Sequence, residues 1–235
     1  MAGDGRNLPT AARQAEVDAF LRQVAAAPAP RAGDGAGRLI FALDATASRQ
    51  PTWDRACHIQ AEMFAETASL GGLAPQLCYF RGFREFETAP WLTEGDALIR
   101  RMTQVTCLSG RTQIGRVLRH AVAEASKNRV NALVYIGDCM EEETDQLGDL
   151  AGQLGLLGVP AFIFQEGNNT RAKRAFEDIA RLTRGAYMRF DADSARVLRD
   201  LLKAVAVYAA GGRKALTAYA GRTGGEVLRL TAQLP

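Results

Sequence analysis

Hydroxyl and carboxylate side chains follow an apolar run near residue 40 at a spacing that suits metal chemistry. Residues 39–43 read Leu-Ile-Phe-Ala-Leu, Asp44 ends that run, and Thr46 and Ser48 follow at alternate positions. Carboxylates and hydroxyls are hard oxygen donors, the type of ligand that Mg²⁺ prefers. If the run is a strand of an open parallel sheet, its carboxyl end lies at the edge where such sheets bind ligands. The sequence therefore predicts a magnesium site after this strand.

Two later segments carry oxygen donors in an equivalent position. A loop over residues 107–115 contains Gly110 and Gly115, and its Thr112 stands at the start of a predicted helix. A second apolar run, residues 132–136, is followed by Gly137 and Asp138. We expect the three loops to leave the same edge of the sheet, which would gather Asp44, Thr112 and Asp138. The competing interpretation is that these hydroxyls only cap helices and form turns, as Ser, Thr and Asp commonly do.

Strands and helices alternate along most of the chain. Apolar runs predict strands over 39–43, 77–80, 132–136, 161–164 and 186–190. Helical spacing predicts helices over 53–69, 112–126, 144–157, 171–183 and 194–209. The segment 84–87 is expected to pair with 77–81 as an antiparallel edge strand. Continuous apolar strands separated by helices indicate a doubly wound, mostly parallel α/β sheet with helices on both faces.

These motifs together resemble the von Willebrand factor A (VWA) domain, over about residues 38–208. The family's metal-ion-dependent adhesion site uses Asp-x-Ser-x-Ser, a loop Thr and a strand-terminal Asp, which often reads Thr-Asp-Gly. This chain has Asp44-x-Thr46-x-Ser48, Thr112 and Asp138 at the corresponding places. Two departures are a Thr for the first Ser, and Gly137-Asp138-Cys139 for Thr-Asp-Gly.

The resemblance implies a role for each residue. Thr46 and Ser48 would ligate Mg²⁺ directly, Thr112 would be a third, conformation-dependent ligand, and Asp44 and Asp138 would act mainly through metal-bound waters. Mn²⁺ accepts the same oxygen donors. The resemblance implies a non-enzymatic, Mg²⁺-dependent protein-binding module, in which an acidic side chain of a partner protein completes the metal shell. It also suggests a place beside a AAA+ ATPase or another assembly factor.

Two other functions fit parts of the pattern. One is a phosphotransferase resembling the haloacid dehalogenase type, with Asp44 as nucleophile and residues 137–142 as its acidic metal motif. That alternative leaves Thr112 without a role, and Lys127 is a poor match for the diagnostic lysine. The other is a metal-free, VWA-like scaffold that binds partners without a cation.

The run Glu141 to Glu143 is expected to start the helix near 144, where the helix dipole favours negative charge, with tuning of the metal as the alternative.

Composition narrows the function classes. The 235 residues include 29 basic and 26 acidic side chains, for a net charge of +3, which is too balanced to indicate nucleic-acid binding. The four cysteines form no CxxC pair. No signal peptide or membrane span is evident, so we expect a cytoplasmic protein without a membrane partner. The expected organisation is an N-terminal amphipathic helix (1–24), a Pro/Gly/Ala linker (25–37), a VWA-like domain (38–208) and a C-terminal extension (209–235).

Overall fold

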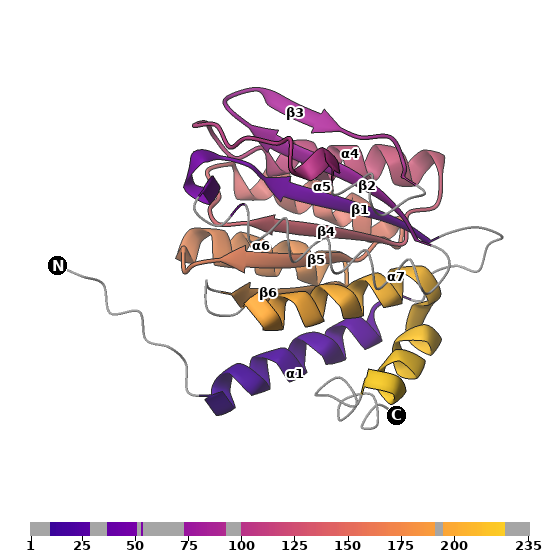
Figure 1. The fold of residues 1–235 in the computed structure, drawn as a ribbon. Coiled ribbons are helices and arrows are strands. Elements are labelled where there is room, and N and C mark those ends of the chain that lie inside the picture. Colours follow the sequence, from indigo (N-terminus) through magenta and orange to yellow (C-terminus); the bar gives the residue numbers. More distant parts are fainter. Residues whose placement is uncertain are drawn as a thin grey trace.

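A six-stranded sheet forms the centre of the molecule (Figure 1). The computed structural model describes residues 10–28, 37–50, 53, 73–92, 100–190 and 195–223. The strand order is β3-β2-β1-β4-β5-β6, and only β3 runs antiparallel to its neighbour. The strands are β1 (Gly37–Asp44), β2 (Leu73–Arg81), β3 (Glu85–Thr88), β4 (Ala132–Gly137), β5 (Ala161–Glu166) and β6 (Ala186–Phe190). The predicted doubly wound sheet with one antiparallel edge strand is confirmed.

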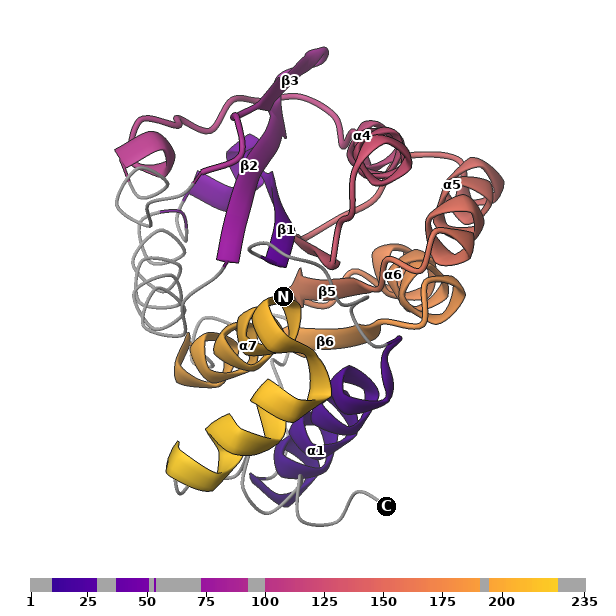
Figure 2. The ribbon, with the colours of Figure 1, turned by 90° about the vertical axis from the view of Figure 1, so that its right-hand side faces the viewer.

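Helices cover both faces of the sheet (Figure 2). One face is covered by α4 (Ile114–Lys127), α5 (Thr144–Leu156) and α6 (Thr170–Leu182). The other face carries α1 (Thr10–Ala26) and α7 (Ala195–Thr223). The helix predicted over 53–69 lies outside the described residues, apart from Trp53.

The apolar character of the strands follows from this double cover. In β1, Leu39, Phe41 and Leu43 belong to the core on the α1 and α7 side. The alternate residues Ile40 and Ala42 belong to the core under α4, α5 and α6. Because both faces are buried, both sets of side chains must be apolar, and the strand reads as a continuous hydrophobic run. Asp44 ends such a strand, so its carboxylate lies at the boundary of the core.

The two helices that flank the sheet on its second face pack on each other and on the sheet. The apolar stripe of α1 is buried, and the ring of Phe20 lies 5.1 Å from that of Phe164 in β5. Helix α7 bends at Gly212, whose φ of 67° is left-handed, and then continues to Thr223. No helix in the described ranges has both the length and the apolar character that crossing a bilayer requires.

Candidate metal centre

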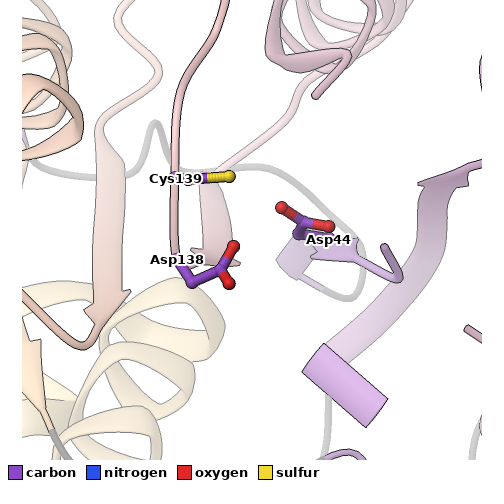
Figure 3. Close-up of side chains that lie close together, drawn as sticks. All are labelled: Asp44, Asp138 and Cys139. Carbon is purple, nitrogen blue, oxygen red and sulfur yellow. The ribbon is translucent and has the colours of Figure 1, made fainter. Parts of the chain in front are cut away.

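The carboxyl ends of β1 and β4 lie side by side at one edge of the sheet. The two strands pair in parallel with Leu43 opposite Ile136, so Asp44 and Asp138 leave the sheet next to each other. Figure 3 shows their carboxylates and the thiol of Cys139 pointing toward one another. One ligand atom from each of the three side chains lies within 4.8 Å of the other two. Strand-end reasoning from sequence thus located the carboxylate pair, but not the thiol.

The loop after β1 folds back on Asp44. The Asp44 Oδ1 atom accepts a hydrogen bond from the backbone N–H of Thr46, at 2.8 Å, which is the local turn that Asp side chains commonly stabilise. The hydroxyls of Thr46 and Ser48 lie 3.1 Å apart. Thr46 is buried, whereas Ser48 is exposed. Three oxygen-bearing side chains of the predicted set therefore occupy one turn, with Ser48 on its solvent side.

The carboxylate of Asp44 sits in an unfavourable environment for its charge. The residue has no exposed surface, and burial raises its pKa to about 6, although the hydrogen bonds from Thr46 oppose the shift. The neighbouring charge of Asp138 raises this pKa further. Among the described residues, Asp44 Oδ2 and Asp138 Oδ1 are buried and have no hydrogen-bond donor. Buried polar atoms are normally paired, so these two oxygens fit a bound cation.

An ion pair with a buried guanidinium lies beside the carboxylates. Arg49, the last residue of the short 3₁₀ helix η1 (Ala47–Arg49), has 1% of its side chain exposed and pairs with Glu166 at the end of β5. The guanidinium also interacts electrostatically with Asp44 and Asp138. Among the described residues, carboxylates at this edge outnumber this guanidinium. A divalent cation would offset part of that negative charge.

The predicted third ligand, Thr112, is held by the loop that follows Asp138. Its hydroxyl accepts a hydrogen bond from the backbone N–H of Glu141 at 3.0 Å, and its own N–H donates to the Glu141 carboxylate at 3.2 Å. The Thr112 hydroxyl also interacts with the carboxylate of Glu142. Thr112 is buried, and its contact with Glu141, three residues after Asp138, places it near the carboxyl end of β4. In this conformation, its hydroxyl is engaged by the acidic loop.

One carboxylate of the acidic run, that of Glu142, caps a helix other than the one that follows the run. The carboxylate of Glu142 accepts hydrogen bonds from the backbone N–H groups of Ile114 and Gly115, the latter at 2.8 Å, at the start of α4. Burial raises the pKa of Glu142, and these hydrogen bonds oppose the shift. Glu143, next to α5, makes no side-chain cap hydrogen bond. The run does precede α5, with Glu143 as the N-cap residue, as expected, but a tertiary contact brings the Glu142 carboxylate to the start of α4.

Backbone contacts hold the loop before α4 against the loop that follows β1 and against the turn between β2 and β3. The loop before α4 runs beside the first loop, where Leu108 N–H donates to the carbonyl of Ala45 at 3.1 Å. Gly110 packs directly on the backbone of Gly82, in the turn between β2 and β3, and a β-carbon there would overlap the Gly82 carbonyl. The absence of a side chain at Gly110 therefore lets the loop close onto the sheet.

Three residues of the centre were missed by sequence reasoning. Arg49 follows Ser48 without any spacing signal, since its role depends on a contact with the end of β5. Tyr135 is fully buried, and burial together with Asp44 and Asp138 raises the pKa of its phenol well above the usual value. Burial, and then Asp138, raise the pKa of the Cys139 thiol to about 12. Cys139 alone had a usable signal, because it stands where the related pattern has Gly.

Comparison with known proteins identifies the architecture. No model of a known protein family and no curated protein sequence matches the chain. The VWA domain of SpRpn10 is similar in structure, with a TM-score of 0.57 at 11% identity, over 71% of this chain and 94% of that one. An aerotolerance-related membrane protein from Bacteroides fragilis has a TM-score of 0.54 at 14% identity, over 70% of this chain and 98% of that one.

A third similar structure carries a metal. Proximal thread matrix protein 1 from the mussel byssus, with a zinc-occupied MIDAS motif, gives a TM-score of 0.59 at 16% identity. The match covers 73% of this chain and 46% of that one. At these identities the likeness establishes the fold alone. The chain has a VWA-like fold, in agreement with the sequence resemblance.

Proposed function

We propose that the protein is a divalent-cation-dependent protein-binding module. The observation that carries the proposal is the pair Asp44 and Asp138, whose buried oxygens have no donor among the described residues. The proposed ligand set is Asp44, Thr46, Ser48, Thr112 and Asp138, with Mg²⁺ as the ion and Mn²⁺ as its substitute. The donors are oxygens, and the two buried carboxylates favour a cation between them.

Each residue of the first loop has a separate role in the proposed centre. Asp44 orients the first loop by accepting a hydrogen bond from the Thr46 N–H, and the Thr46 and Ser48 hydroxyls of this loop lie next to each other. Thr46 and Ser48 are neutral donors, which leaves most of the ion's charge uncancelled by its direct ligands. When bound, the ion supplies an electrophilic centre that attracts an anionic ligand. Ser48 is exposed, so the ligand approaches from its side.

The partner that fits this arrangement is a protein presenting a carboxylate. A Glu or Asp side chain would complete the coordination shell, and the binding would then depend on the metal. The VWA-like neighbours, including the one with zinc in its MIDAS motif, support a metal-dependent interaction module. A AAA+ ATPase or another assembly factor is the first class of partner to test.

The phosphotransferase alternative has less support from the geometry. A nucleophilic aspartate needs open access to the phosphoryl group, but Asp44 has no exposed surface. Lys127 ends α4, far along the helix from Thr112, and its ammonium lies 3.6 Å from Glu124. Neither residue is arranged for the chemistry that this alternative requires of it.

Titration calorimetry of Mg²⁺ and Mn²⁺ into the metal-stripped protein tests the proposal. We expect one saturable site in the wild type, lost in Asp44→Ala and kept in Asp149→Ala, which removes an exposed carboxylate on α5. A pull-down with and without chelator on the same samples would then detect the metal-dependent partner. Equal binding by the wild type and Asp44→Ala would refute the assignment. A generic phosphatase assay on these samples tests the enzymatic alternative.

A further inference from the structure

A thiol lies among the oxygen donors of the candidate centre. Cys139 directly follows Asp138, and its sulfur is within 4.8 Å of a carboxylate oxygen of both Asp44 and Asp138. Figure 3 shows the sulfur pointing into the space between the two carboxylates. Elsewhere in the described ranges, no other group of three His, Cys, Asp or Glu side chains converges in this way. The Asp-Asp-Cys combination is therefore a specific feature of this edge.

An independent observation is a buried carboxylate oxygen at this edge that has no hydrogen-bond donor among the described residues. Asp44 is completely buried, and its Oδ2 atom has no hydrogen-bond donor within the described residues. A buried, unpartnered carboxylate oxygen is costly unless a cation or donor pairs with it. The thiol that follows β4 therefore lies near the carboxylate at the end of β1, one of whose oxygens has no donor among the described residues.

We propose that Cys139 is a direct metal ligand, and that the centre binds Zn²⁺, or another thiophilic divalent ion, more tightly than Mg²⁺. The proposal rests on the proposed function only in placing a divalent cation at this edge. Thiolate sulfur is a soft donor that selects ions such as Zn²⁺, whereas Mg²⁺ takes oxygen donors almost exclusively. Asp44, Asp138 and Cys139 would supply three anionic ligands, and water would take the fourth tetrahedral position.

The separations are compatible with such a site. Ideal tetrahedral zinc with bonds of about 2.3 Å to sulfur and 2.0 Å to oxygen places its ligand atoms about 3.3–3.5 Å apart. The observed separations are at most 4.8 Å, so a side-chain adjustment of about 1.5 Å or less closes the largest. Cys139 is only half-buried and can make this adjustment. On coordination, the thiol proton leaves to solvent and the sulfur binds as thiolate.

The thiolate changes what the centre offers to a partner. With oxygen ligands alone, the ion retains positive charge that attracts a carboxylate. With Cys139 bound as thiolate, the centre carries one more negative charge and has less attraction for an acidic side chain. The identity of the ion would thereby control the partner site, with Mg²⁺ favouring acidic ligands and Zn²⁺ disfavouring them.

The test uses metal alone on the metal-stripped full chain. Zn²⁺ and Mg²⁺ are titrated by calorimetry, and Co²⁺ is followed by absorbance, since a thiolate-to-cobalt charge-transfer band reports a sulfur ligand. Wild type is compared with Cys139→Ser, with Cys139→Gly as a second variant lacking the thiol. Cys107→Ser is the matched control, because Cys107 is a half-buried thiol of the neighbouring loop that is outside the cluster.

We expect one Zn²⁺ per chain, with affinity at least about 100-fold above that for Mg²⁺. Cys139→Ser and Cys139→Gly should lower the Zn²⁺ affinity about 10-fold or more and abolish the cobalt band, whereas Cys107→Ser keeps both. Unchanged Zn²⁺ affinity in the Cys139 variants, or a cobalt band that survives in them, would overturn this proposal. Neither result would count against the proposed binding of Mg²⁺. Cys139-dependent Zn²⁺ binding without Mg²⁺ binding in the wild type would support it, and would instead refute the magnesium function.

Discussion

Replacing Asp44 with Asn tests the electrostatic logic of the centre. The carboxylate is fully buried and its pKa is raised from 3.8 to about 6, chiefly because burial removes water from the charged form. A shift of about 2 units corresponds to about 3 kcal/mol of stability lost when the group is ionised in the folded, metal-free protein. Asn has nearly the same shape, and its carbonyl oxygen can still accept the Thr46 N–H. We therefore predict that Asp44→Asn stabilises the metal-free protein at pH 8 by about 2–3 kcal/mol.

The pH dependence has a defined sign. The pKa of Asp44 is higher in the folded chain than in the unfolded chain, so the folded state binds the proton more tightly. The stability that this proton provides is fully present below about pH 4 and is lost as the pH rises through about 6. The stability difference between the variant and the wild type should therefore be greatest above pH 7. At pH 5 it should fall to about half.

Urea denaturation of both proteins in chelator, at pH 5 and pH 8, measures this difference. At pH 8 the predicted gain in the free energy of unfolding corresponds to a rise of about 4–12 °C in Tm in a separate thermal melt, for a chain of this size. Adding Mg²⁺ at 100 times its dissociation constant should stabilise the wild type by about 2.7 kcal/mol, and so close the gap. A variant that is less stable than wild type in chelator, with a difference independent of pH, would refute the reasoning.

The remaining predictions concern the loops around the centre. Glu142→Gln should lower stability by about 1–2 kcal/mol in urea denaturation, because it removes charge-assisted caps from the start of α4, whereas Glu143→Gln should be nearly neutral. Gly110→Ala should destabilise the fold by about 1–3 kcal/mol, since its β-carbon meets backbone, while Gly152→Ala in open space on α5 should stabilise it by up to about 1 kcal/mol. Equal effects within either pair would contradict the contacts described. Arg49→Met should cost about 3–5 kcal/mol because it removes a buried guanidinium that pairs with Glu166, and unchanged thermal stability would disprove that role.

Much of the sheet could be predicted from sequence because it is buried on both faces. The apolar runs located five of the strands. The predicted and observed strand ends differ mainly where polar residues occur inside a strand. β2 begins at Leu73 rather than 77, since Pro75 and Gln76 obscured its first half. Pro75 is accommodated because β3 pairs with β2 only from Cys78 onward. The helix expected to end at 209 is interrupted at Gly212, and a second helical segment follows it to Thr223.

The site was predictable only as far as strand order and chain direction determine it. Asp44 and Asp138 follow neighbouring parallel strands, so their proximity could be inferred from the alternation of elements alone. The hydrogen bond between Thr112 and Glu141 joins residues 29 positions apart, and no periodic pattern encodes it. The position of Cys139 among the carboxylates likewise depends on how its loop turns after the strand. Such contacts require the three-dimensional structure.

A crystal structure of the protein soaked in Mn²⁺, with anomalous diffraction data, tests the central claim most directly. We expect one strong anomalous peak at the carboxyl edge of β1 and β4, from a manganese ion coordinated by the Thr46 and Ser48 hydroxyls and adjacent to Asp44 and Asp138. The same soak of Asp44→Ala should show no peak there. Wild-type crystals that show no anomalous peak at this edge after the soak, or that bind manganese only elsewhere, would contradict the assignment of the centre.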